Sequence, residues 1–94
     1  MTWSIVARDR SSGQFGIAIS SRVIAVGAMC PMFRDGAGAL SSQSYTSPVA
    51  GDRVLRALAE GCEPAAAMDS ALDGDQGHMW RQIHGVDATG KPFA

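Results

Sequence analysis

Alternation of side chains in residues 2–8 and 15–21 is the feature that most limits how this chain can fold. In the first segment every second residue is tryptophan, isoleucine or alanine, and in the second every second residue is phenylalanine or isoleucine. A period of two is the period of a β-strand. A turn-forming run at 9–13 separates the two segments. The sequence therefore predicts an antiparallel hairpin at the N-terminus.

Three further segments have strand or turn composition. Residues 36–43 predict a glycine-rich strand whose end turns polar, and residues 79–86 predict another strand. Residues 23–29 are a short, mostly β-branched apolar run, which we expect to be extended or a buried connection that ends at Pro31. Residues 87–91 are typical of a hairpin turn, with Gly90 at a positive-φ position.

Two helices are predicted between these strands. Ser47 and Pro48 are typical of an N-cap followed by proline in the first helical position, and Gly61 marks the end of that helix. Valine and leucine residues form its apolar stripe. The second helix begins near Pro64 and ends at 73–74.

Strands together with helices predict an α+β fold in which helices cover a sheet. The glycine-rich strands present small or apolar residues on both faces, and two short helices can cover only one of them. Only residues 92–94 follow the last hairpin turn, which is a very short second arm. We therefore expect residues 1–94 to be the N-terminal half of a single domain. A second chain, another copy or a removed segment would supply the missing cover.

Charge and composition exclude several classes of partner. The chain has 94 residues, a formal net charge of −1 and two cysteines. Proteins that bind nucleic acid through its phosphates are normally basic, so no nucleic-acid partner is expected. No apolar run approaches the roughly 20 residues that span a bilayer, and the first residues do not resemble a signal peptide. These features predict a cytoplasmic protein that does not bind membranes.

Thr2 is the first candidate nucleophile. If Met1 is removed, as a small second residue permits, the α-amine of Thr2 becomes a base beside its own hydroxyl. The simpler interpretation is that Thr2 is an ordinary residue at the start of a strand. Cys30 and Cys62 are further candidates, although cysteine is most often buried as apolar filler.

Metal and cofactor chemistry has little support in the sequence. His78 and His84 are separated by a spacing that fits no common metal site, and His84 is expected to be packed or hydrogen-bonded on a strand face. The scattered acidic residues form no pair typical of a glycosidase. Residues 36–39 contain two glycines but lack the rest of a dinucleotide fingerprint. No metal and no cofactor is therefore predicted.

Polar residues gather at 20–22 and 41–44, where two apolar strands end. Such residues over a small-residue face are typical of a pocket wall, and an arginine there suits a carboxylate or a carbonyl oxygen. Ordinary surface polarity is the alternative interpretation.

Residues 2–9, 13–22 and 25–28 resemble the opening of an uncharacterised bacterial family, number 1028 among the domains of unknown function. The resemblance continues in order at residues 36–39, Gln43, Leu55, Gly61, Arg81, Gln82, Val86, Asp87 and Gly90. The chain departs from the family pattern at Ser47 and Cys62.

Members of this family resemble N-terminal-nucleophile (Ntn) hydrolases, which implies a four-layer αββα sandwich. The resemblance implies a self-cleaved amidohydrolase that acts on a small amide, either a non-peptide or a short peptide bond. This chain would be the α subunit, and the nucleophile would begin a partner β chain, the C-terminal fragment. The heterodimer would assemble into a higher homo-oligomer. Ser21, Arg22, Gln43 and Ser44 would bind or orient the small-molecule substrate.

Two alternatives to this function stay open. In the first, Thr2 itself is the nucleophile after Met1 is removed. In the second, the fold is a binding or assembly module without catalysis, because a fold does not determine an activity.

Overall fold

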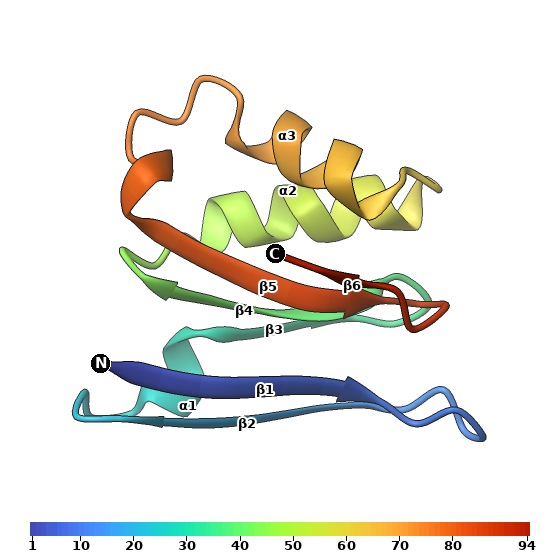
Figure 1. The fold of residues 1–94 in the computed structure, drawn as a ribbon, viewed down its shortest axis with the longest axis horizontal. Coiled ribbons are helices and arrows are strands. Elements are labelled where there is room, and N and C mark those ends of the chain that lie inside the picture. Colours follow the sequence, from blue (N-terminus) through green and yellow to red (C-terminus); the bar gives the residue numbers. More distant parts are fainter.

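Two antiparallel sheets and a pair of helices are stacked in three layers (Figure 1). The computed structural model describes residues 1–94. A two-stranded sheet packs under a four-stranded sheet, and helices α2 (Pro48–Ala59) and α3 (Pro64–Leu72) cover the opposite face of the four-stranded sheet. The predicted α+β class is confirmed. These residues do not form the second helical layer of the expected αββα sandwich.

The predicted hairpin is formed by β1 (Thr2–Arg8) and β2 (Phe15–Ser21). Its register pairs Thr2 with Ser21 at the end where the chain starts. Asp9 holds the turn, because its carboxylate accepts hydrogen bonds from the main-chain N–H and the hydroxyl of Ser12 at 2.7 and 2.6 Å. The hydroxyl bond from Ser12 is the main reason that the pKa of Asp9 is lowered.

The four-stranded sheet has the order β3 (Pro31–Arg34), β4 (Gly38–Ser44), β5 (Arg81–Asp87) and β6 (Pro92–Phe93). β4 lies between the helices and the hairpin, so residues 39–42 are fully buried, with 0% exposure. Both predicted strands are confirmed, and each starts two residues later than expected. The predicted turn is also confirmed, with Gly90 at φ 91°.

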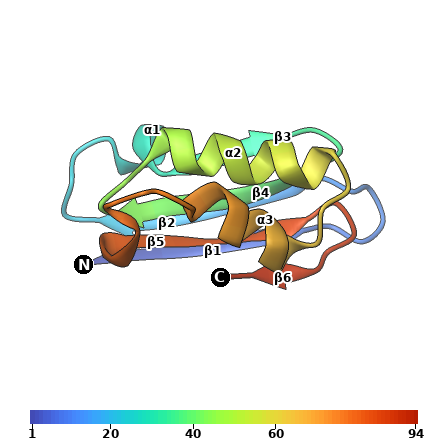
Figure 2. The ribbon, with the colours of Figure 1, turned by 90° about the horizontal axis from the view of Figure 1, so that it is seen from above.

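The two predicted helices are confirmed, and Figure 2 shows α2 over β3 and β4 and α3 over β5 and β6. The Ser47 hydroxyl caps α2 by accepting a hydrogen bond from the N–H of Ala50 at 3.1 Å. Val54, Leu55 and Leu58 face the sheet and form the core with Leu40 of β4 and residues of α3. None of the helices is long and apolar enough to cross a membrane.

Two expectations about secondary structure are wrong. Residues 23–29 are neither extended nor buried: Ala25 adopts a left-handed conformation (φ 59°) and starts the short helix α1 (Val26–Met29). Ile24 is 91% exposed. Pro31 does not end a segment but begins β3, an edge strand whose first residue tolerates proline.

The strand predicted from residue 79 is preceded by a short helical turn. Residues 78–80 form the 3-10 helix η1 (His78–Trp80), and β5 starts at Arg81. Trp80, which falls within the predicted strand of residues 79–86, therefore lies outside the observed strand and is 70% exposed.

The hairpin presents a mixed face to the middle sheet, which is polar near Thr2 and Ser21 and apolar at Ile17 and Ile19 of β2. On β1, Thr2, Ser4 and Val6 are partly buried against that sheet, whereas Trp3 and Ile5 point outward and are 73% and 65% exposed. The space between the two sheets is consequently lined by polar side chains at one end.

Candidate active site

A polar cluster lies between the hairpin and the middle sheet. Its members are Thr2, Ser4, Ser21, Ser41, Gln43, Gln82 and His84, which are joined by side-chain hydrogen bonds. The inner faces of packed sheets are usually apolar, so a polar cluster here is unusual. No buried side-chain nitrogen or oxygen lacks a hydrogen-bond partner. Every buried polar side-chain atom of the cluster therefore has a hydrogen-bond partner.

Gln43 is at the centre of the network and is 5% exposed. Its Nε2 donates to the main-chain oxygen of Thr2 at 3.3 Å and to Oε1 of Gln82 at 3.0 Å. Its Oε1 accepts from the hydroxyls of Ser4 and Ser41 at 2.6 and 3.0 Å. The Thr2 carbonyl can only accept, so a reversed Gln43 amide would place two oxygens against each other. The orientation of Gln43 is thus fixed.

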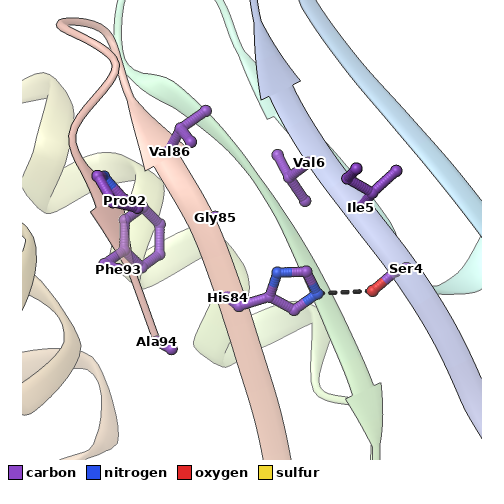
Figure 3. Close-up of a pocket in the computed structure, with 9 residues that line it drawn as sticks. All are labelled: Ser4, Ile5, Val6, His84, Gly85, Val86, Pro92, Phe93 and Ala94. Carbon is purple, nitrogen blue, oxygen red and sulfur yellow. Dashed lines mark hydrogen bonds between the residues drawn. The ribbon is translucent and has the colours of Figure 1, made fainter.

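This orientation determines the proton on His84. The hydroxyl of Ser4 has one proton, and it is donated to Gln43. Nε2 of His84 lies 2.6 Å from Oγ of Ser4, so Nε2 must carry a proton and donate it to that oxygen (Figure 3). His84 therefore does not act as a base toward Ser4, and this arrangement does not form a serine–histidine nucleophile pair.

Thr2 is held by two different residues. Its Oγ1 lies 3.0 Å from Oγ of Ser21, across the first residue pair of the hairpin, and its main-chain oxygen accepts from Gln43. Oγ of Ser21 also accepts a hydrogen bond from the N–H of Val23 at 3.3 Å. Met1, the residue before Thr2, is 93% exposed. The hydroxyl and the main chain of Thr2 are consequently both positioned at the start of β1.

The structure brings two of the four predicted substrate-binding residues, Ser21 and Gln43, to Thr2. The other two, Arg22 and Ser44, each follow one of these residues in the chain and are exposed. Neither forms a side-chain hydrogen bond or an ion pair, so both side chains are available to a ligand. Ser44 has φ 65°, a left-handed conformation that is uncommon for a residue with a side chain.

An ion pair lies beside Ser44. Arg81 pairs with Ser44 in the register of β4 and β5, and its Nη2 donates to Asp75 at 2.9 Å. Nη1 of Arg81 donates to the main-chain oxygen of Tyr45 at 2.7 Å. The hydrogen bonds from Arg81 are the main reason that the pKa of Asp75 is lowered to about 2. Arg81 thereby fixes the segment that follows Ser44.

Sequence reasoning gave Ser4 no role in a site and treated His84 only as a packed or hydrogen-bonded residue. Each stands two residues from another member of the cluster, Ser4 from Thr2 and His84 from Gln82, so a period of two places each pair on one strand face. The sequence does not show that these two faces meet.

The other candidate residues lie apart from this network. Cys30 is 4% exposed, as expected of apolar filler, but Cys62 is exposed in the connection between α2 and α3, so the filler interpretation is wrong for it. His84 is hydrogen-bonded on a strand face, as expected. No three His, Cys, Asp or Glu side chains lie close enough together to hold a metal ion.

A groove opens beside His84. It has a volume of about 490 Å³ and runs between β1 and the pair β5 and β6 (Figure 3). Val6 and Val86 form part of its walls, and none of its lining residues is Asp, Glu, Lys or Arg. The groove is thus lined by mostly apolar side chains together with Ser4 and the imidazole ring of His84.

A family model described as a family of unknown function (DUF1028) matches residues 2–94. The chain belongs to DUF1028. This confirms the resemblance inferred from the opening residues.

A solved structure from the same family supports the fold. The DUF1028 chain is similar to protein SPO2555 from Silicibacter pomeroyi, described with the same family, with 30% sequence identity and a TM-score of 0.90. The match covers 98% of this chain and 43% of that chain, so the DUF1028 chain spans less than half the length of this relative. No curated protein matches the chain significantly.

Proposed function

We propose that this chain provides the nucleophile and part of the substrate pocket of an amide hydrolase of the N-terminal-nucleophile type. The observation that carries the proposal is the position of Thr2. It is the first residue of β1, its hydroxyl lies 3.0 Å from the hydroxyl of Ser21, and the residue before it, Met1, is exposed. Removal of Met1 would place a free α-amine beside that hydroxyl.

The proposed reaction uses groups that Thr2 itself carries. The α-amine takes the hydroxyl proton as Oγ1 attacks the carbonyl carbon of a small amide. The proton passes to the leaving nitrogen as the C–N bond breaks, and an ester to Thr2 remains. Water then hydrolyses the ester, releases the acid and restores the hydroxyl.

Neighbouring residues would position the nucleophile and the substrate. Ser21 orients the Thr2 hydroxyl, and Gln43 holds the Thr2 main chain. The side chains of Arg22 and Ser44 are exposed and form no hydrogen bond or ion pair. They would bind the carbonyl oxygen or a carboxylate of the substrate.

A second candidate places the nucleophile at the start of a separate β chain, with this chain as the α subunit of a self-cleaved enzyme. β6 supports it, because it is the last strand of its sheet, so one of its edges is available to a strand from a partner.

Both candidates share a proposed partner, a second polypeptide that carries the rest of the domain and covers the outer face of the hairpin. Trp3 and Ile5 leave an exposed apolar surface there, with a hollow of about 290 Å³ beside them. The similar solved chain is more than twice as long as the part that matches, since the match covers 43% of it. We propose that the second polypeptide corresponds to this additional length and covers the outer face of the hairpin.

N-terminal sequencing and intact-mass measurement of the purified protein, with any polypeptide that co-purifies, test the two candidates. Thr2 at the N-terminus, turnover of a simple amide, loss of turnover in Thr2→Ala and partial retention in Thr2→Ser would support the first. Thr46→Ala is the matched control. Retained Met1 with a partner that starts at Thr, Ser or Cys would support the second. Tight binding of an amide, urea or dipeptide without turnover would favour a binding module instead.

A further inference from the structure

We propose that the free edge of β3 is an interface at which two copies of this chain pair about a two-fold axis, so that their four-stranded sheets join into one. β3 and β6 are the two edge strands of this sheet, and the partner strand considered above would take the edge of β6. The interface does not depend on the proposed hydrolysis, because it needs neither Thr2 as nucleophile nor the removal of Met1.

The main-chain groups of Phe33 face the free edge. Hydrogen bonds to β4 begin at Cys30, whose oxygen accepts from the N–H of Ser42 at 2.9 Å, and they alternate, so they recur at residues 32 and 34. Pro31 and Phe33 therefore point outward, and Pro31 has no N–H. Two copies of Phe33 that face each other can exchange both N–H···O bonds. Their rings, each 54% exposed in one copy, would then meet across the axis.

This register brings Arg34 of one copy to helix α2 of the other. With Phe33 on the axis, Arg34 lies opposite Met32 of the second copy, with their Cβ atoms about 5 Å apart. Met32 packs against Gly51 of α2 so closely that a Cβ on Gly51 would collide with its sulfur. Arg34, two residues further along the strand, projects to the same helix-covered side. It is exposed and forms no ion pair within its own chain.

Asp52 supplies the complementary charge. Gly51 faces the sheet, and Ala50 and Asp52 lie about 100° to either side of it, on the two flanks of α2. Ala50 is 3% exposed, as expected of the flank that α3 covers, whereas the side chain of Asp52 is 47% exposed. Asp52 therefore lies on the flank above β3 (Figure 2). Its carboxylate accepts from Arg56 of the same helix at 2.8 Å and has room for a second arginine.

The two-fold axis repeats the contact between Arg34 and Asp52, so the edge is self-complementary in charge as well as in main-chain hydrogen bonds. Native mass spectrometry of the purified protein, with any polypeptide that co-purifies, counts the copies of this chain in each particle. Two copies, or a multiple of two, are expected. One copy would overturn the proposal.

Charge reversal tests the register. Arg34→Glu and Asp52→Lys each bring like charges together at both contacts, so each should weaken the association of copies at least about 10-fold in sedimentation velocity. Arg53→Glu, at an exposed position of the same helix, is the matched control and should leave association unchanged.

A mixture of the two charge-reversed variants separates this geometry from a general effect of charge or of misfolding. In a mixed pair the new carboxylate of one copy faces the new ammonium group of the other, and the second contact keeps Arg34 with Asp52. The mixture should associate as the wild-type protein does, although neither variant does so alone. Unchanged association of either variant, or no recovery in the mixture, would refute the pairing of β3 with β3. Since no activity is measured, the result is independent of whether the chain belongs to a hydrolase.

Discussion

Oε1 of Gln43 and Oγ of Ser4 lie 2.6 Å apart, and this contact ties the hairpin to the middle sheet. Through it the orientation of one buried amide determines the proton position on a serine and on a histidine. Gln43 also reaches the main chain of Thr2, so one side chain connects the proposed nucleophile with the groove.

Replacement of Gln43 should destabilise the fold strongly. Gln43→Leu removes four hydrogen bonds and leaves the partners Ser41 and Thr2 partly unsatisfied, which should cost about 2–4 kcal/mol of unfolding free energy. Urea unfolding followed by circular dichroism measures this change. Gln76→Leu, at an exposed position, is the control and should change the free energy by less than about 0.5 kcal/mol. Equal effects of the two variants would contradict the central role of Gln43.

Replacement of Arg22 should affect turnover without affecting the fold. Arg22 is exposed and unpaired, so Arg22→Ala should leave the unfolding midpoint unchanged. Loss of a hydrogen bond from a charged group to the substrate should lower kcat/KM at least about 10-fold. Steady-state kinetics on the amide that the protein hydrolyses gives this ratio. Arg10→Ala, in the turn of the hairpin, is the matched control; unchanged kinetics in Arg22→Ala would remove Arg22 from the site.

The Asp75–Arg81 pair should make stability depend on pH in the acidic range. The pKa of Asp75 is lowered to about 2 by its hydrogen bonds from Arg81, whereas an unfolded aspartate has a pKa of about 3.9. A lowered pKa means that the folded state binds the proton less readily than the unfolded state does. The contribution of the ionised Asp75 carboxylate to the unfolding free energy is therefore complete above about pH 4 and is lost as the pH falls toward 2.

Comparison of the wild-type protein with Asp75→Asn isolates this contribution. The pKa of Asp9 is also lowered, mainly by the Ser12 hydroxyl, and that of Asp87 is lowered because hydrogen bonds from Thr89 and Lys91 outweigh its burial. The lowered pKa values of Asp9 and Asp87 are present in both the wild-type protein and Asp75→Asn, so their effects on stability cancel when the two proteins are compared. The difference in unfolding free energy should shrink between pH 4 and pH 2, as measured by urea unfolding at each pH. Asp73→Asn, at an exposed position, is the control, and a constant difference for Asp75→Asn would count against the assignment.

Polar substitutions on the outer face of the hairpin should weaken association rather than folding. Trp3 and Ile5 are 73% and 65% exposed, so Trp3→Gln with Ile5→Thr should change the stability of these three layers by no more than about 0.5 kcal/mol per site. The same pair of changes should release the proposed second polypeptide, as seen by sedimentation velocity. Val49→Thr, 61% exposed on α2, is the control that should leave association intact. Undiminished association in the double variant would show that the partner binds elsewhere.

Local chemistry made much of the fold predictable. The hairpin, the strand of residues 36–43 and both long helices were predicted because period-two alternation, a serine–proline start and terminal glycines act within a few residues. Residues 23–29 were predicted wrongly because Ala25 adopts a left-handed backbone conformation, and the composition of this segment does not indicate such a turn. β3 was missed because its proline resembles a strand end, although an edge strand tolerates proline at its first residue.

The sequence by itself determined the hairpin, two strands of the middle sheet and the two longer helices, together with the mild acidity, Thr2 as a candidate nucleophile and the polar ends of two strands. Only the tertiary structure decided which face of the hairpin turns inward, with Thr2 and Ser4 inside and Trp3 and Ile5 outside. It also decided that Ser4 meets His84, 80 residues away, and that Gln43 meets Thr2, 41 residues away. Such contacts depend on how whole sheets stack, and no local pattern of side chains encodes that stacking.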